Sequence, residues 1–524
     1  MSKHDAIDDV PTADDVRAAL NSVLASDVLR NSPQLAAFLR FVVEAVLHGN
    51  GERIKGYTIA VEVFRRDADF DPQIDPIVRV EATRLRRALE RYYGGVGADS
   101  PVRINLARGS YVPTFSYRPS SHPSPAARAY SEIGNGMPTL LVEPFDMLST
   151  QGAQSMSPRA LHEKLCDAFA RFDTINIAVE AGNPGHEPVS DYRLNGTLES
   201  RDDGTTTVRF RLVDMANRTV VWSRAFERTA TAGGRADAED AIVTELAAVL
   251  VQPFGVIRAH ERLRHLATGD GDPRYRCIVE ASESFRSFDP GQHAHARACL
   301  ERLTSANPGF SIGFAYLAAI YFREFQYGYS ESQNDRAMLD CALEFARRAI
   351  ELKPQSSLAY QMLFGVLFAR REIAAAFAAG DKAIALNRYD MTVVSDYGGR
   401  LVMTGEIERG MNILMRAAEF GTVRPSWYHF YLFLGSYLRG DLINTIHHAN
   451  QITNENYPLR PIAHALAAMR AGEPERAAQA LDRLKVLRPA WAANPRRELE
   501  KFIPNAEITG RLTNDLTKAG LVST

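Results

Sequence analysis

The chain has few cysteines, no excess of charge of either sign and no long apolar run. Its four cysteines (Cys166, Cys277, Cys299 and Cys341) are far apart and form no CxxC pair, which argues against a disulfide scaffold or a zinc knuckle and favours reduced thiols. Lys and Arg number 61 against 63 Asp and Glu, a net charge of -2. A chain that is basic throughout is therefore excluded, whereas a local basic patch is not.

The chain also lacks the signals of membrane insertion and export. It begins MSKHDAIDDVPTADD, which is acidic and polar, unlike the cationic start and apolar core of a secretory signal. Its apolar stretches, such as FLRFVVEAVL, carry charges and are well short of the ~20 apolar residues that cross a bilayer. We expect a cytoplasmic protein that does not contact a membrane.

The chain of 524 residues has the composition of an ordinary globular protein, with 45% hydrophobic and 24% charged residues. At ~150 residues per domain this length predicts three or four domains. A Pro-, Ser- and Ala-rich stretch without apolar period reads as a linker, and strand-like patterning disappears after ATGDGDP. We predict four segments: an N-terminal domain (1–117), a linker (118–137), a mixed α/β domain (138–266) and a helical domain (267–524).

The last segment contains a repeat of 34 residues. AIELKP at Ala349 aligns with AIALNR at Ala383, AAEFGT at Ala417 and QITNEN at Gln451, each 34 residues further on. LTSANP ends at Pro308, 46 residues before the end of AIELKP, which predicts a 12-residue insertion near FQYGYSESQNDR. Paired helices at this period resemble the tetratricopeptide repeat. The resemblance implies an α-solenoid of five or six units with a concave, partner-binding face.

Three residues occupy equivalent positions in successive units, and we expect them to face this groove: Gln361, Ser395 and His429. They are the predicted contacts for a protein or peptide ligand. Their mixed chemistry does not resemble the Lys/Asn clamp with which tetratricopeptide domains hold a C-terminal carboxylate.

The middle segment alternates between strand and helix patterns. TLLVEPF and INIAV read as short strands, SPRALHEKLCDAFARF as a helix started by Ser157 and Pro158, and TTVRFRLVD as a strand of a sheet with one wet face. The order VEPF, YRLNGTL and RFRLVDMANRTVVWSRAFER resembles the α/β domain named after the N-terminal part of TolB. That resemblance implies a structural or interaction module, which in bacteria often precedes tetratricopeptide repeats.

The N-terminal segment carries a basic helix, IVRVEATRLRRALERYY. Its apolar residues recur at steps of 4, 3, 4 and 3, which is one face of an α-helix: Val78, Ala82, Leu85, Leu89 and Tyr92. Five arginines stand against two glutamates in this helix. PVRINLARGSYVPTF follows and reads as a β-hairpin with Arg108 and Gly109 at its tip.

RLRRAL followed by INLARGSYV is similar to the end of OmpR-type winged-helix domains, where a recognition helix precedes a wing. The resemblance covers about residues 55–115; the OmpR type begins with a small sheet, whereas the first fifty residues here look helical. It implies binding of double-stranded DNA. The predicted DNA contacts are Arg79, Thr83, Arg84, Arg86, Arg87, Arg103 and Arg108, with Arg79, Arg86 and Arg87 pointing outward. The alternative is a solvated or protein-docking face neutralised by Asp67, Asp69, Asp71 and Asp75.

Signs of catalysis and of metal binding are weak. His162 and Cys166 fall one residue short of an HExxH motif, and His293, His295 and Cys299 lack a fourth ligand. Phosphate-loop and dinucleotide motifs are missing from the sequence. We therefore predict no enzyme, no cofactor and no metal.

Three functions remain in order of preference. The first is a one-component transcriptional regulator with a DNA-binding winged helix and a repeat domain that senses a protein or peptide, expected to act as a homodimer on paired half-sites. The second is an adaptor whose winged helix docks protein. The third, a signalling protein related to adenylate cyclases, follows only from how this architecture is often annotated, because no segment remains for a cyclase domain with two metal-binding aspartates.

Overall fold

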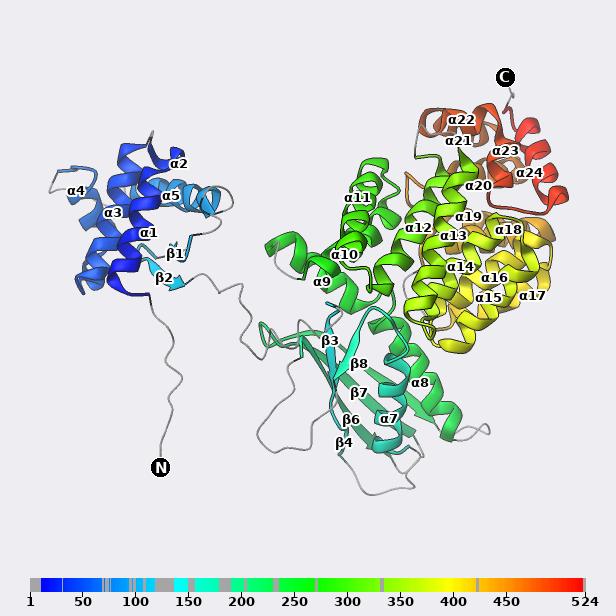
Figure 1. Cartoon of the computed structure of the whole chain (residues 1–524), viewed down its shortest axis with the longest axis horizontal. Helices are drawn as coiled ribbons and strands as arrows, with labels where there is room; N and C mark the ends of the chain where they lie inside the picture. The colour runs from blue at the N-terminus through cyan, green and yellow to red at the C-terminus, as the bar shows by residue number, and fades with distance from the viewer. Residues whose placement is uncertain are drawn as a thin grey trace. The chain divides into compact units, whose positions relative to one another are not determined.

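The chain forms two compact units, Met1–Ile133 and Gly134–Thr524. The computed structural model in Figure 1 describes residues 11–521 with these exceptions: 31, 68–69, 71–74, 76, 94–96, 98–99, 107–109, 118–135, 149–155, 179–189, 202–204, 230–234, 269–271, 330–333 and 421–423. Within these residues no helix combines the length and the apolar character that crossing a membrane requires.

Unit 1 is a group of helices followed by a strand pair. Its elements are α1 (Ala13–Ala25), α2 (Asp27–Arg30), α3 (Pro33–Leu47), the 3₁₀ turn η1 (Gly51–Arg53), α4 (Gly56–Glu62), α5 (Ile77–Tyr93), β1 (Val102–Asn105) and β2 (Thr114–Tyr117). Thr12 caps α1 by accepting a hydrogen bond from the Asp15 N–H, and Pro33 opens α3. The core joins these elements through fully buried side chains such as Phe38, Val42 and Leu85.

The strand pair is antiparallel, with Val102 opposite Tyr117 and Asn105 opposite Thr114. Val102 and Ile104 are buried in the core, and the residues between and after them are exposed. This alternation is the two-residue period of a strand with one covered face. It places Arg103 on the exposed side of β1.

Unit 2 begins with a six-stranded sheet in the order β5-β3-β6-β7-β8, with β4 also paired to β6. The strands are β3 (Thr139–Val142), β4 (Asp146–Met147), β5 (Asn176–Ala178), β6 (Tyr192–Ser200), β7 (Thr205–Asp214) and β8 (Thr219–Thr229). β3 runs parallel to β5 and β6, whereas β6, β7 and β8 form antiparallel pairs.

Two helices cover this sheet, α7 (Pro158–Phe169) and α8 (Arg235–Leu250) (Figure 1). Ser157 accepts a hydrogen bond from the Ala160 N–H, and Pro158 is the first residue of α7. The predicted helix start is therefore confirmed. Leu165 of α7 and Leu246 of α8 are fully buried in one core with the inner face of the sheet.

The rest of unit 2 is helical. After α9 (Val256–Thr268), helices follow in pairs: α10 (Pro273–Ser287) and α11 (Pro290–Ala306), α12 (Ser311–Tyr327) and α13 (Asp335–Leu352), α14 (Ser357–Ala369) and α15 (Ile373–Leu386), α16 (Met391–Thr404) and α17 (Ile407–Ala418), α18 (Ser426–Arg439) and α19 (Leu442–Asn450), α20 (Leu459–Ala471) and α21 (Pro474–Leu487). The chain ends with α22 (Pro489–Ala493), α23 (Pro495–Glu500) and α24 (Ala506–Lys518).

These pairs form the tetratricopeptide-type solenoid that the sequence predicts. The step from Ser311 to Ser357, the starts of α12 and α14, is 46 residues; the next three steps, to Met391, Ser426 and Leu459, are 34, 35 and 33. α12 and α13 have 17 and 18 residues, whereas α14 and α15 have 13 and 14. The insertion therefore lengthens both helices of one pair as well as their connection.

Close packing within the pairs depends on small residues. A methyl group on Gly410 of α17 would lie 2.5 Å from the carbonyl oxygen of Gly398 of α16, so a larger side chain would push the two helices apart. Gly405 ends α16 with a φ of 104°, a conformation that suits glycine. Ala376 and Ala383 are fully buried, as expected for positions of close helix approach.

The sheet and the repeats of unit 2 share polar contacts. Asp173, which follows α7, accepts hydrogen bonds from the Ser356 hydroxyl (2.9 Å) and the Leu358 N–H (3.2 Å) at the start of α14. Lys353 forms an ion pair with the same carboxylate at 2.6 Å. The Gln252 side chain donates to the Tyr389 carbonyl before α16. A carboxylate from the α/β region thus satisfies one free N–H group at the start of a repeat helix.

One prediction about the cysteines is wrong. Cys277 of α10 and Cys299 of α11 form a disulfide, while Cys166 and Cys341 are free. The 22-residue separation hid this pair, because only the antiparallel packing of two helices brings the two positions together.

Candidate functional site

α5 is amphipathic in the predicted register. All five residues of its apolar seam are at most 5% exposed (Val78, Ala82, Leu85, Leu89 and Tyr92), and the opposite face carries exposed Arg79, Thr83, Arg84 and Arg87. Asp75 accepts a hydrogen bond from the Ile77 N–H at the start of the helix and forms an ion pair with Arg66. Of the other acids considered as neutralising partners, Asp69 and Asp71 lie outside the described residues.

Arg86 does not point outward as predicted. Its side chain is half-buried, and it donates hydrogen bonds to the carbonyls of Leu106 (3.0 Å) and Ser110 (2.9 Å). The guanidinium therefore links Leu106 and Ser110 to α5. The helical period places Arg86 at the border of the exposed face, and only the position of the following strand decides that it is covered.

The remaining predicted DNA contacts have different surroundings. Arg84 donates to Glu81 one turn earlier, at 2.8 Å. Arg103 is exposed on β1, with its guanidinium carbon 5.7 Å from the centre of the Tyr93 ring. Tyr93 accepts a hydrogen bond from the Ile104 N–H, and burial raises the pKa of its phenol. Arg108 lies outside the described residues.

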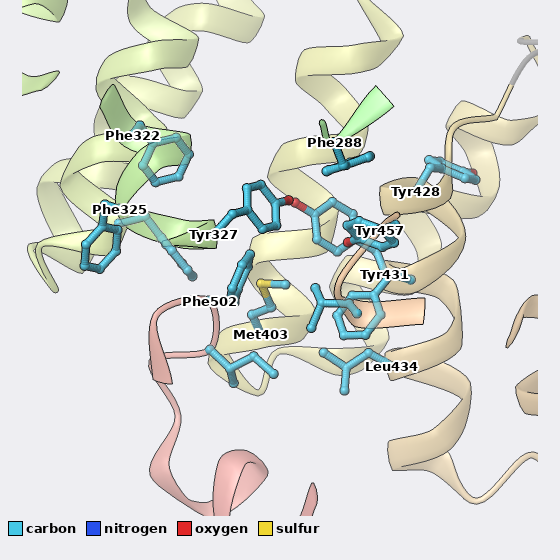
Figure 2. Close-up of a cluster of buried hydrophobic side chains, with 14 of the residues drawn as sticks. Phe288, Phe322, Phe325, Tyr327, Met403, Tyr428, Tyr431, Leu434, Tyr457 and Phe502 are labelled. Atoms are coloured by element: carbon cyan, nitrogen blue, oxygen red, sulfur yellow. The ribbon is translucent and has the colours of Figure 1, made fainter. Parts of the chain in front are cut away.

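The repeats form a partly open cavity of about 180 Å³, which we call the groove cavity. Its walls come from α10, α12, α14, α16 and α18, together with residues that precede α9 and that follow α19 and α23. Figure 2 shows aromatic side chains of these walls, including Phe322, Tyr327, Tyr431, Tyr457 and Phe502. Rings therefore form much of the surface that an occupant would meet.

Three arginines and one carboxylate also line the groove cavity: Arg286, Arg323, Arg400 and Asp396. The Arg400 side chain is 7% exposed and lies 3.2 Å from Asp396. Its guanidinium carbon is 4.8 Å from the centre of the Phe368 ring and 4.9 Å from that of Phe364. The Nε atom of Arg400 is buried and has no hydrogen-bond partner among the described residues. Asp396 is also occupied by the Tyr431 hydroxyl, which donates to it at 2.9 Å.

Arg323 of α12 is half-buried, and no carboxylate of the described residues pairs with it. Its guanidinium carbon lies 4.3 Å from the centre of the Phe285 ring, and it donates a long hydrogen bond of 3.3 Å to the Phe285 carbonyl. A cation held over a ring in a partly dry site remains available to an anionic group.

The three predicted partner contacts do not line one common cavity. Gln361 lines the groove cavity, whereas Ser395 lines a neighbouring pocket of about 270 Å³ beside Trp222 and Gln252. His429 is buried, with its ring 5.9 Å from that of His448. Burial lowers the pKa of both imidazoles to about 4.

The groove arginines are not among the site residues that the sequence predicts. Their signal is weak, because Arg323 and Arg400 lie within helices rich in apolar residues rather than in a basic run. A better signal is Gly365, where an added methyl group would lie 3.2 Å from Phe322 and 3.3 Å from Arg400. A glycine inside a helix indicates that large side chains of neighbouring helices meet there.

Comparison with known proteins yields no relative in sequence. No family model matches the chain, and no curated protein matches it. Three solved structures illustrate the structural likenesses. Human IFIT1, as a dimer with m7Gppp-AAAA, is 14% identical with a TM-score of 0.36; the match covers 51% of this chain and 65% of IFIT1. This chain thus spans less than two thirds of that protein.

The other two are smaller proteins. PilW, a type IV pilus biogenesis factor, is 18% identical with a TM-score of 0.29, and the match covers 41% of this chain and 94% of PilW. YrrB, described as a TPR protein with an unusual peptide-binding site, is 17% identical with a TM-score of 0.25, over 36% of this chain and 92% of YrrB.

Proposed function

We propose that this protein is an interaction adaptor whose repeats bind a segment of a partner protein in the groove cavity. The observation that carries the proposal is the cavity itself, which is lined by the first helices of consecutive repeats and holds three arginines against one carboxylate. First helices line the concave face of such solenoids, which is the face that they use for binding.

The lining of the groove cavity defines the chemistry of the occupant. Rings of α12 and α18 favour an aromatic or large aliphatic side chain, because each apolar Å² removed from water stabilises binding by about 25 cal/mol. Asp396 is already occupied by Arg400 and Tyr431. Arg323, in contrast, lies beside two rings and one carbonyl, and no carboxylate of the described residues pairs with it. The expected ligand is a peptide segment with an acidic residue beside an aromatic one.

Selection of displayed random peptides on the full chain tests this proposal. Selected peptides should combine acidic and aromatic residues, and Arg323→Gln should weaken their binding by about tenfold, or ~1.4 kcal/mol. Arg302→Gln on α11, a second helix of its pair, is the matched control because Arg302 is also a helical arginine but is exposed. Arg323→Glu should reverse the charge preference toward Lys- and Arg-containing peptides. Peptides that bind equally to all four proteins would overturn the proposal.

A second candidate function rests on α5. Arg79, Thr83 and Arg87 lie exposed along one face of this helix, and the following β1 presents Arg103 on its exposed side. Together with the resemblance to an OmpR-type winged helix, this favours contact with DNA phosphates. The chain would then be a one-component regulator that carries the adaptor groove as its sensor, with the TolB-like domain between them.

Titration of the full chain with fragments of genomic DNA over a range of salt concentrations tests the second function. Each lost phosphate contact should lower the salt slope by about one unit, so Arg79→Gln, Arg87→Gln and Arg103→Gln should each flatten it. Arg40→Gln on α3 is the control, because Arg40 is an exposed arginine of the same unit outside α5 and β1. Unchanged DNA binding by the triple variant would show that this face does not contact DNA and would leave α5 as a protein-docking face.

A further inference from the structure

The first repeat pair contains, on two facing helices, four side chains of types that can bind metals. Cys277 and Glu280 are three residues apart on α10, and His295 and Cys299 are four residues apart on α11. Residues at these spacings lie on one face of a helix. The bond between Cys277 and Cys299 shows that the two faces are turned toward each other. This arrangement does not involve the groove cavity or α5.

Three of these side chains converge on one point, and the fourth, His295, lies beside one of them, Glu280. Ligand atoms of Cys277, Glu280 and Cys299 all lie within 4.8 Å of one another, and the Nε2 atom of His295 lies 3.5 Å from Oε2 of Glu280. That Oε2 atom is buried and accepts no hydrogen bond within the described part of the chain. The other oxygen of Glu280 is 4.0 Å from Nε of Arg276. A buried carboxylate oxygen without a donor is an acceptor that a cation would satisfy.

We propose that, once Cys277 and Cys299 are reduced, these four residues bind one Zn²⁺. Two thiolates, an imidazole and a carboxylate match the ligands and the tetrahedral coordination that zinc takes in proteins. The soft thiolates favour zinc over Mg²⁺ or Ca²⁺, which prefer oxygen ligands. With two thiolates, one carboxylate and Zn²⁺ the site carries a charge of about -1, and Arg276 lies beside it. His295 supplies the fourth ligand. Because its side chain is 69% exposed, the ion can reach the site from solvent on this side.

Reduction and metal binding are separate steps. A trialkylphosphine breaks the disulfide, and each sulfur gains one electron and one proton, while the phosphine takes the oxygen of a water molecule and becomes its oxide. Zn²⁺ then replaces the two thiol protons, which pass to the buffer, and the oxidation state of the metal does not change. The disulfide and the metal exclude each other, because both need the same two sulfur atoms.

Cobalt and zinc titrations of the full chain without an affinity tag test the site. After reduction with a phosphine in the absence of oxygen, the protein should bind one Co²⁺ per chain with the visible bands of a tetrahedral ion and a thiolate-to-metal charge-transfer band. Zn²⁺ should then remove both signals. The oxidised protein should give neither signal. Reduced protein that binds no metal, or binds Co²⁺ without the thiolate band, would overturn the proposal.

Variants identify the ligands. The double variant Cys277→Ser and Cys299→Ser should lose the charge-transfer band, and the matched double variant Cys166→Ser and Cys341→Ser should keep it, because it removes only the free thiols. His295→Ala and Glu280→Gln retain all four cysteines and should each weaken metal binding by about tenfold or more. If the first double variant binds metal as the unaltered chain does, the ion is adventitious and the proposal is wrong. If neither single variant changes the affinity or the cobalt spectrum, the four-ligand site is wrong even where the serine variant fails to fold.

Discussion

Arginine has opposite surroundings in α5 and in the groove cavity. Arg79 and Arg87 are exposed to water on α5, whereas Arg400 is 7% exposed and lies against phenyl rings and one carboxylate. The first environment follows from the period of a single helix. The second arises only when neighbouring repeats cover a helix on the inside of the solenoid. Arginine content of a helix therefore indicates little about its role until its burial is known.

The largest difference in stability should appear between two single variants, one that removes a buried arginine and one that removes an exposed arginine. Arg400→Met leaves Asp396 with a buried charge and no cation beside it, which should lower the free energy of unfolding of unit 2 by about 3–5 kcal/mol. Arg87→Met should change stability by no more than about 0.5 kcal/mol. Urea unfolding followed by circular dichroism measures both. Adding Asp396→Asn to Arg400→Met should restore part of the loss, and equal stabilities of the two single variants would contradict the comparison.

The same comparison of a covered with an exposed arginine can be made within α5, between Arg86 and Arg87. Because Arg86 donates to the carbonyls of Leu106 and Ser110, Arg86→Met should destabilise unit 1 by about 1.5–3 kcal/mol. Its neighbour Arg87 is the matched control. Proteolysis of the segment after β1 should also become faster in the Arg86 variant alone. Identical unfolding curves for the two variants would show that these hydrogen bonds contribute nothing.

The stability of unit 2 should also depend on pH, through three histidines that are buried or half-buried. Burial lowers the pKa of His429 and His448 to about 4 and that of His293 to about 3. As the pH falls below ~6.5, these histidines therefore become protonated in the unfolded chain before they do so in the folded chain. Each histidine should therefore cost about 1.4 kcal/mol of stability per pH unit between ~6.5 and its folded pKa, and none above this range. Urea unfolding between pH 7 and 5 should show a smaller slope in His429→Gln and His448→Gln. His48→Gln, at a 62% exposed side chain of unit 1, is the control; an unaltered slope in all three variants would refute the assignment.

The smallest expected effect concerns the exposed face of α5. Replacing Arg79 and Arg87 together with Gln should leave the melting temperature nearly unchanged, because exposed substitutions stay within about 0.5 kcal/mol. Any loss of DNA or protein binding by this variant would then be a loss of contact rather than of folding. A marked drop in the melting temperature would show instead that these arginines stabilise unit 1.

Features set by local periodicity could be predicted from the sequence. The 34-residue step, the start of α7 at Pro158 and the buried seam of α5 all depend on spacings within one element or between identical elements. A side chain that repeats every third or fourth residue faces one direction whatever its neighbours are.

Features that depend on how different elements meet could not be predicted. The Cys277–Cys299 bond, the burial of Arg86 and the aromatic setting of Arg400 each require the position of a second or third element. The groove positions show the same limit: Gln361 and Ser395 are equivalent in the repeat, yet they line different pockets, and Trp222 of the sheet lines only the pocket of Ser395. The repeat predicts that corresponding residues of successive units have the same surroundings, whereas contacts with other parts of the chain make these surroundings differ.

The carboxylate of Asp173 has a mechanical consequence. A solenoid behaves like a spring, since each repeat touches mainly the next one and the coil can stretch or bend along its length. Asp173 fixes the start of α14 through two hydrogen bonds and the Lys353 ion pair. The α/β region therefore restrains the solenoid from bending at this turn. The turn at the start of α14 should therefore keep its pitch when a ligand changes the spacing of other repeats.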